Sequence, residues 1–208
     1  PILASTVPSV RTYDPAFAWE LAVLVRFGIQ RMFVEDHDEL FYLMMYNEAL
    51  PMPARPDHSD LDDGVVRGGY LLEPAAGDGP RVNLLGSGTI LFEVMQAANT
   101  LRDEGYAVAV YSITSYVELA RDAERAEQED AVDTAWLDTI FPETDVPTVA
   151  ATDYVRALPR MIASWINGPF TALGTDGFGK SERRSDLRAH FKVDAASIAD
   201  AARRLASR

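Results

Sequence analysis

A glycine-rich stretch near the C-terminus has the spacing of a phosphate-binding loop. Residues 174–181, GTDGFGKS, fit G-x-x-x-x-G-K-[ST], a pattern in which backbone N–H groups and the lysine hold nucleotide phosphates. A short apolar run precedes the loop, and Ser181 could cap a helix through Leu187 and Phe191. A phosphate loop also needs an acidic magnesium ligand at the end of another strand, and Asp153 could take that place.

The same stretch has a second interpretation that involves no ligand. It lies close to the C-terminus, and the residues after it read as helix with no further strand. It would then be a turn from a last strand into a last pair of helices, in which Asp176 caps the turn or pairs with Lys180. The net charge of −13 also disfavours phosphate binding.

Two other groups of residues could carry chemistry. Gly86-Ser87-Gly88 has the form of a dinucleotide-binding turn, but Leu91 stands at the third glycine position, so tight packing explains the glycines equally well. Nothing in the sequence indicates a base partner for Ser87. Three histidines are scattered without the paired spacing of a zinc site. They are His37, His58 and His190.

Composition places the chain among globular proteins. Its 208 residues suit one large domain or two small ones, and 48% hydrophobic residues are ordinary for a packed core. Cysteine is absent, which excludes disulfides, thiolate catalysis and sulfur metal sites and fits a reducing cytoplasm. The acidic charge argues against nucleic acid as a partner. No apolar run approaches the ~20 residues of a membrane span, so no membrane partner is expected.

The first part of the chain predicts strands alternating with helices. Asp14-Pro15 is a typical helix start, and apolar residues then recur at helical spacing to about residue 33. Residues 40–46, LFYLMMY, predict a strand buried on both faces. A proline-rich segment follows, after which Ser59 could cap a short helix. Further short strands are expected at residues 7–13 and 70–72.

From Arg81 onward the alternation is regular. Short apolar runs predict strands, and segments with one apolar stripe predict the helices between them. The predicted strands are residues 82–85, 107–113, 147–151 and 170–173. The predicted helices are residues 90–104, 115–127, 153–165 with a break at Pro159, and 195–207 behind an Asp194 cap. Residues 136–147 read as irregular, and the acidic run 124–133 as solvated surface.

This alternation predicts an α/β fold. Short apolar strands separated by helices favour a three-layer α/β/α arrangement around a mostly parallel sheet. The segment EPAAGDGP, residues 73–80, has no periodicity and is rich in proline and glycine. We therefore expect two domains, residues 1–80 and 81–208.

Six stretches, taken in order, resemble a known family. They are TYDPAFAWELA, YNE with its proline-rich loop, LLGSGTI, VYSITSYVELARD, VAATDYVRALP and LGTDGFGKSERRSDLRAHFKVD. Over about residues 5–200 the chain resembles the homodimeric type of pyruvate dehydrogenase decarboxylating component, which is thiamine diphosphate-dependent and transketolase-like. The SITSYVELARD run and the GTDGFG loop are its most specific parts. The family usually carries Arg where Lys180 stands. The resemblance therefore implies that the match to the phosphate-loop pattern is a coincidence.

The resemblance implies that this chain is a C-terminal portion. Residues 1–80 would end the domain that binds the aminopyrimidine ring of the cofactor, and residues 81–208 would be a transketolase-type C-terminal domain. Thiamine diphosphate and Mg²⁺ would be bound mainly by upstream regions, which also carry the glutamate that activates the cofactor. The N-terminus has no initiator Met and no signal-peptide pattern, in keeping with a piece of a longer cytoplasmic protein. Alone, the chain should be inactive.

The implied reaction decarboxylates pyruvate and passes an acetyl group to a lipoyl group. The candidate catalytic residue in this chain is Glu48, which leaves a strand on an irregular loop, although a solvated carboxylate is the alternative. Asn47 reads as a turn residue. Many family members have histidine where Pro51 stands, and proline transfers no proton. Another group would then do that work, and His58 is near enough in sequence to be considered.

The resemblance also implies partners, namely a second copy in a homodimer and a lipoyl-bearing dihydrolipoyl acetyltransferase. Two alternatives remain open at this point. As a separate molecule the chain would be a non-catalytic structural or dimerisation module. It could also be a nucleotide-binding protein that uses residues 174–181.

Overall fold

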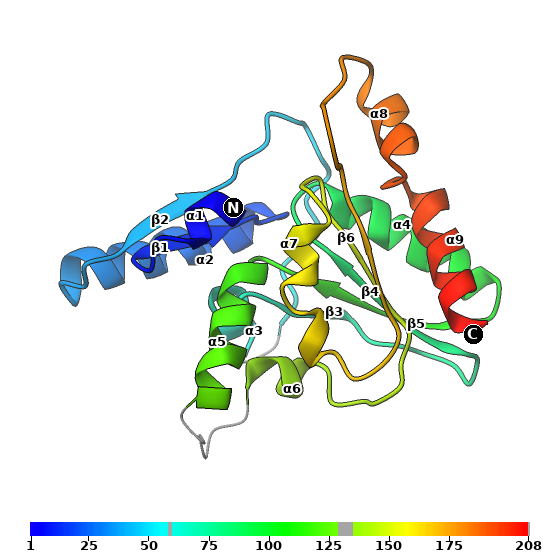
Figure 1. Ribbon diagram of the computed structural model, residues 1–208, viewed down its shortest axis with the longest axis horizontal. Helices are drawn as coiled ribbons and strands as arrows, with labels where there is room; N and C mark the ends of the chain where they lie inside the picture. Colours follow the sequence, from blue (N-terminus) through cyan, green and yellow to red (C-terminus); the bar gives the residue numbers. More distant parts are fainter. Residues whose placement is uncertain (58–59, 129–134, 208) are drawn as a thin grey trace.

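The protein contains two sheets that share one seam. A computed structural model describes residues 1–57, 60–128 and 135–207. A two-stranded sheet lies at one end, and a five-stranded sheet with helices on both faces forms the rest (Figure 1). His58 and Ser59 lie outside the described residues, as does the end of the acidic run.

The smaller sheet is built from the first 43 residues. A short helix, α1 (Ile2–Ser5), precedes strand β1 (Val10–Tyr13), which pairs in parallel with β2 (Leu40–Leu43). Helix α2 (Ala18–Ile29) connects the two strands and continues into a π-helical turn, Gln30–Val34. The predicted strand, helix and strand are all present, and two of their details differ.

Helix α2 begins later than predicted. Its N-cap is Phe17 rather than Asp14, because the Glu20 carboxylate accepts hydrogen bonds from the backbone N–H groups of Ala16 and Phe17 and so fixes the first turn there. The Asp14 side chain is occupied elsewhere, by the Tyr46 hydroxyl.

The prediction of a strand buried on both faces at residues 40–46 is wrong. Strand β2 ends at Leu43, and its side chains alternate between exposed and half-buried. The physical reason is that α2 packs on the face that carries Phe41, so Leu40 and Tyr42, which alternate to the other face, are exposed.

The larger sheet has the strand order β3-β5-β4-β6-β7. Its edge strand β3 is antiparallel to β5, and the remaining neighbours are parallel, which confirms the predicted mostly parallel sheet. The strands are β3 (Tyr70–Glu73), β4 (Arg81–Gly86), β5 (Ala107–Ser112), β6 (Thr148–Ala151) and β7 (Phe170–Leu173).

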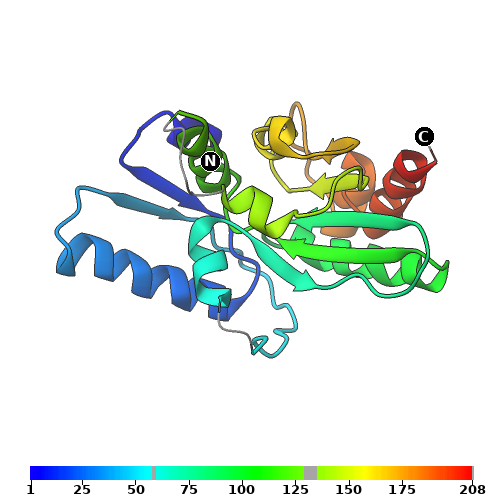
Figure 2. The same cartoon turned by 90° about the horizontal axis from the view of Figure 1, so that it is seen from below.

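Helices cover both faces of this sheet, as Figures 1 and 2 show. On one face pack α4 (Ile90–Asp103) and α9 (Ala195–Ala206), whose apolar stripes bury Leu101 and Ile198 in one core cluster. On the other face pack α5 (Tyr116–Gln128), α6 (Trp136–Ile140) and α7 (Ala157–Arg160) around a second cluster. The three-layer α/β/α prediction is confirmed. Helix α3 (Leu61–Arg67) lies beside α2 of the smaller sheet. Helix α8 (Arg184–Phe191) follows the loop after β7 and precedes α9.

Two further sequence predictions need correction. The segment at 136–147 is not wholly irregular, since α6 buries Leu137 and Ile140 against α5. The helix predicted from Asp153 is broken into the four residues of α7 and a 3-10 turn at Ala163–Trp165. Pro159 lacks the N–H that a continuous helix needs, and Asp153 caps neither piece.

The sheet crosses the domain boundary predicted at residues 73–80. Strand β3 precedes this segment, yet it pairs with β5 of the larger sheet. The division into residues 1–80 and 81–208 stays a prediction about independent folding units.

Residues 117–122, VELARD, lie in helix α5 and connect it to the smaller sheet. Glu118 of α5 binds Arg11 of β1 at 2.5 Å. Arg121 donates to the carbonyl oxygens of Val10, Ser5 and Val7 at 2.9 to 3.1 Å. This stretch therefore has an architectural role.

Replacing Arg121 with alanine should weaken the contact between helix α5 and the smaller sheet. Three backbone carbonyls lose their donor, and because hydrogen bonds to charged groups contribute ~1.5–3 kcal/mol we expect the free energy of unfolding to fall by about 2 kcal/mol. Urea unfolding measures the change. Arg204→Ala, at an exposed position of α9, is the matched control and should have little effect. Equal stability of the two variants would contradict the assignment.

Candidate active site

A pocket of about 360 Å³ opens at the carboxyl ends of the parallel strands. From the central strand β4 the chain passes to β5 on one side and later returns to β6 on the other, so the strand order reverses between β4 and β6. Crevices at such a reversal are the usual ligand sites of open α/β sheets. Thr89, Asp153 and Thr175, which follow β4, β6 and β7, line the pocket.

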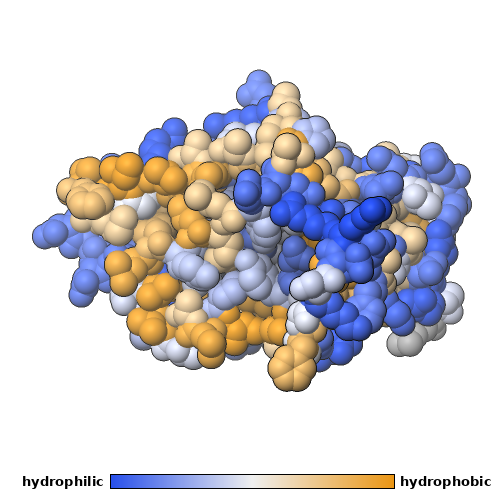
Figure 3. All heavy atoms as spheres, turned by 90° about the horizontal axis from the view of Figure 1, so that it is seen from above, coloured by the Kyte–Doolittle hydropathy of each residue, from blue (hydrophilic) through white to orange (hydrophobic). Residues whose placement is uncertain are grey.

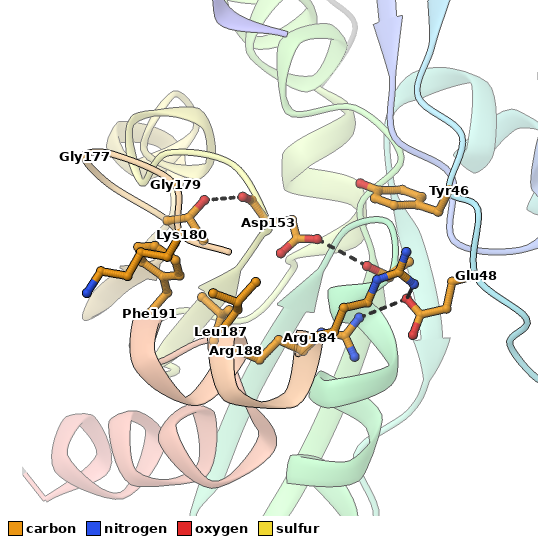
Figure 4. Close-up of a pocket in the computed structure, with 13 residues that line it drawn as sticks. Tyr46, Glu48, Asp153, Gly177, Gly179, Lys180, Arg184, Leu187, Arg188 and Phe191 are labelled. Atoms are coloured by element: carbon orange, nitrogen blue, oxygen red, sulfur yellow. Dashed lines mark hydrogen bonds and ion pairs between the residues drawn. The ribbon is translucent and has the colours of Figure 1, made fainter. Parts of the chain in front are cut away.

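The opposite wall comes from distant parts of the chain. Tyr46 and Glu48 follow β2, and Arg184 and Arg188 are one turn apart on α8 (Figure 4). Leu187 and Phe191 supply the apolar floor. The pocket is therefore made jointly by the segment after the smaller sheet, by Thr89 after β4 and by the last third of the chain.

Glu48 is held by two arginines. Its Oε2 lies 2.6 Å from Arg184 Nη1 and 3.3 Å from Arg188 Nη2. Arg188 also binds Glu93 of α4 at 3.1 Å, and Glu93 in turn accepts the backbone N–H of Ala195 at 2.9 Å. These ion pairs hold the Glu48 side chain, which is 20% exposed, at the pocket.

Asp153 lies across the pocket from Glu48. Burial raises the pKa of its carboxyl, while Arg188 and the Thr89 hydroxyl, 3.4 Å away, act in the opposite direction. Its backbone carbonyl accepts a hydrogen bond from the Thr175 hydroxyl. The loop after β7 is thereby fastened to the loop after β6.

The loop at residues 174–181 does not form a phosphate cradle. Helix α8 begins at Arg184, three residues after Ser181, so no helix N-terminus faces the glycines. The Lys180 side chain extends away from Asp153 (Figure 4). Asp176 pairs with Arg156 at 2.6 Å and accepts its backbone N–H, not with Lys180 as one alternative predicted. The turn interpretation therefore holds, and the loop is one wall of the pocket.

The remaining candidates lie outside the pocket lining. His37 is at the surface beside Glu35, and the His190 ring contacts the edge of Phe191. The buried Ser87 hydroxyl bonds Thr152 at 3.0 Å and also lies within hydrogen-bonding reach of the Asp14 carboxyl. Through its backbone carbonyl, Asn47 accepts a hydrogen bond from Arg184.

The sequence did not single out several pocket residues. Tyr46, Arg184 and Arg188 are not among the predicted site residues, and Asp153 is predicted as a magnesium ligand and as the start of a helix. Arg184 and Arg188 stand four residues apart in the sequence, and on a helix this spacing places both side chains on the same face. Tyr46 could be recognised only once its hydrogen bond was seen.

Within the described ranges no three His, Cys, Asp or Glu side chains are arranged to hold a metal ion. Nor does any helix in these ranges combine the length and apolar character that crossing a bilayer requires.

Comparisons with known proteins agree on the family. Residues 68–194 match the transketolase-like TK C-terminal domain, and residues 1–53 match the middle domain of the pyruvate dehydrogenase E1 component. The chain is 40% identical to the pyruvate dehydrogenase E1 component of Corynebacterium glutamicum, over 95% of the chain and 22% of that protein. The corresponding Escherichia coli K12 protein is 38% identical, over 97% of the chain and 23% of its own length.

The solved structure of transketolase from Leishmania mexicana has the same fold, with a TM-score of 0.70 and 17% identity over 99% of the chain and 26% of that protein. The chain spans less than a quarter of the length of the two pyruvate dehydrogenase E1 components. It belongs to the family of transketolase-like C-terminal domains, in the form that pyruvate dehydrogenase E1 components carry after their middle domain.

Proposed function

We propose that this chain is the C-terminal part of a subunit that decarboxylates pyruvate and acetylates a lipoyl group. The observation that carries the proposal is the pocket at the strand-order reversal, whose walls come from both family-matched segments. The names of the relatives supply the reaction class.

The described residues do not fit the role of holding thiamine diphosphate and Mg²⁺ by themselves. They offer no group of three acidic or histidine side chains for the metal ion. We therefore assign cofactor binding to the remainder of the longer subunit. This chain contributes one wall of the reaction cleft.

On that wall, the proposed role of Glu48 is electrostatic. It holds the Arg184 and Arg188 guanidinium groups beside the cavity, where fixed charges can orient an anionic 2-oxo acid. Because the arginines already bind the carboxylate, Glu48 acts on the reactant through them and through the local field.

An exposed apolar surface supports a larger assembly. Figure 3 shows apolar side chains gathered over the end of the molecule that contains α2, β1 and β2. The exposed large residues there are Val25, Ile29, Phe33, Val34, Leu40, Tyr42 and Met45. Apolar side chains exposed on the outer side of α2 and on the open face of β2 mark interaction surfaces. We propose that preceding residues of the longer polypeptide cover it.

The finer assignments follow the same proposal. Residues 1–80 would complete the pyrimidine-binding domain, and residues 81–208 would form the C-terminal domain. The assembled subunit would act as a cytoplasmic homodimer with a lipoyl-bearing dihydrolipoyl acetyltransferase as partner. Support for these points comes from the relatives alone.

An assay of CO₂ release tests the function. The longer polypeptide, supplied with thiamine diphosphate, Mg²⁺ and pyruvate, should release CO₂, and the isolated 208-residue chain should not. Release by neither would overturn the catalytic proposal and leave the chain as a structural module. Release by the isolated chain would contradict the assignment of cofactor binding to other regions.

A further inference from the structure

A second cavity, of about 540 Å³, is lined by strands β3, β4 and β5 and by helix α6 with the residues that follow it. It shares no lining residue with the pocket at the carboxyl ends of the strands. Helix α6 lies at the lower side of Figure 1, whereas α8, which lines that other pocket, lies at the upper side. Small-molecule sites occupy roughly 300–1,000 Å³, so the size of this cavity suits a small molecule.

An unpaired amide lines this cavity from the central strand of the sheet. Asn83 of β4 is 8% exposed, and its side chain makes no hydrogen bond with any residue that the structure describes. The residues beside it in the sheet are Ala109 on β5 and Thr148 on β6. Ala109 has no polar side chain, and the Thr148 hydroxyl donates to the Val146 carbonyl at 3.1 Å. Both the NH₂ group and the carbonyl oxygen of Asn83 are therefore available to a ligand.

The fold itself does not require an amide at this position. Side chains on one face of a strand are two residues apart, so Asn83 shares its face with Leu85, which belongs to an apolar core cluster together with Ala109 and Tyr111. Packing alone favours an apolar, β-branched residue such as valine in a buried strand of this kind. A bound ligand that pairs with the amide would explain why asparagine stands there.

Aromatic rings form another wall of the cavity. Tyr111 of β5 is 6% exposed, and its ring packs against that of Phe141 with the centroids 4.6 Å apart. Trp136 lines the cavity from α6. The Tyr111 hydroxyl makes no hydrogen bond within the described part of the chain. Burial raises the pKa of Tyr111 to about 12, with Glu143 acting in the same direction and Arg81 against it, so the hydroxyl stays protonated at neutral pH. This wall thus offers flat apolar surface and one neutral hydroxyl group.

The inner part of the cavity is neutral. Among the described residues, its charged lining side chains are Asp60, Arg81 and Glu143, and all three residues are exposed. Arg81 and Glu143 pair with each other at 2.9 Å. An ionic group on a ligand would lose its hydration beside the buried apolar wall without meeting an opposite charge there. The cavity therefore favours a neutral ligand over an anion or a cation.

We propose that this cavity binds an uncharged, ring-shaped small molecule that carries a carboxamide or an equivalent amide edge. The Asn83 side chain donates from its NH₂ group to the ligand carbonyl and accepts from the ligand N–H. The ring of the ligand packs against the aromatic wall of Tyr111 and Phe141. This site is separate from the proposed reaction cleft, and the inference does not depend on the proposed function.

The test is a ligand-observed NMR titration of the longer polypeptide with benzamide, which combines an aromatic ring with an amide edge. Benzamide should bind saturably, and benzoate, which has the same shape and a negative charge, should bind at least about tenfold more weakly. Asn83→Val should weaken benzamide binding by roughly tenfold or more, the scale of the lost hydrogen bonds, while its melting temperature is no lower than that of the unsubstituted protein. Tyr111→Phe should cause a smaller loss of affinity.

Asn99→Ala, at an exposed position of α4, is the matched control and should leave benzamide binding unchanged. Absence of saturable benzamide binding, or an unaltered affinity in Asn83→Val, would overturn the site. Benzoate binding as tight as that of benzamide would refute the neutral ligand class. A lowered melting temperature of Asn83→Val would show that the amide supports the fold and would also count against the proposal. None of these outcomes bears on the proposed function, because neither pyruvate nor thiamine diphosphate takes part in the titration.

Discussion

Replacing Glu20 with alanine should lower the free energy of unfolding of the 208-residue chain by about 4 kcal/mol, because three buried donors and one half-buried donor lose their acceptor at ~1 kcal/mol or more each. Glu20 is 0% exposed. Its Oε1 accepts the hydroxyls of Tyr70 and Ser112 at 2.7 and 2.6 Å, and its Oε2 accepts two backbone N–H groups. One carboxylate thus joins α2 to β3 and β5.

Two other variants separate the causes. Glu20→Gln keeps the shape and one acceptor oxygen, so its loss should be smaller than that of Glu20→Ala. Glu124→Ala, at an exposed position of α5, should change stability by less than ~0.5 kcal/mol. Urea unfolding gives all three values. A loss for Glu20→Ala no greater than that for Glu124→Ala would mean that Glu20 does not hold the seam.

The pH dependence of this effect has a defined sign. Burial raises the pKa of Glu20 above its ordinary 4.5, and its hydrogen bonds act in the opposite direction. A carboxyl with a raised folded-state pKa contributes stability that is fully present below the unfolded-state value and is lost as the pH rises through the folded-state value. The chain should therefore lose stability relative to Glu20→Gln as the pH rises from 4.5. A difference that stays constant with pH would contradict the raised pKa.

Replacing Glu48 with alanine in the longer polypeptide should lower pyruvate turnover by roughly 10–100-fold, the scale expected when fixed charges at a reaction site are misplaced. Without the carboxylate, Arg184 loses its 2.6 Å partner and Arg188 keeps only Glu93. Both guanidinium groups can then move within the cavity. The melting temperature should not change, because Glu48 lies on a loop outside the core clusters.

Steady-state kinetics on three variants and the unsubstituted enzyme check this prediction. Glu48→Gln removes the charge but keeps the shape, so its turnover should lie close to that of Glu48→Ala if the charge is what matters. Glu124→Ala should match the unsubstituted enzyme. Turnover of Glu48→Ala within twofold of the unsubstituted enzyme would remove Glu48 from the site.

The strands of the larger sheet could be predicted because local pattern and global fold agree there. Short apolar runs at β4 to β7 are bounded by turns, and β4, β5 and β6 are buried on both faces, which leaves one solution for them. Strand β2 has the same apolar composition but an exposed face, so composition alone overstated its burial. The start of α2 was also missed, because Glu20 reaches back across the seam to fix it.

The site was less predictable, because its residues come together only through topology. Glu48 and Arg184 are 136 residues apart in the chain, and no periodic pattern links them. The loop at 174–181 can be recognised from its sequence pattern, yet the same pattern also fits a nucleotide-binding loop. The position of α8, which begins at Arg184, and the pairing of Asp176 with Arg156 separate the two interpretations.

We propose that the chain completes a thiamine-dependent site and that it does not bind the cofactor unaided. Calorimetric titration with thiamine diphosphate and Mg²⁺ tests that claim when the longer polypeptide and the isolated 208-residue chain are compared under the same conditions. The longer polypeptide should bind the cofactor, and the isolated chain should give no heat of binding. Tight binding by the isolated chain, or binding by neither protein, would contradict it.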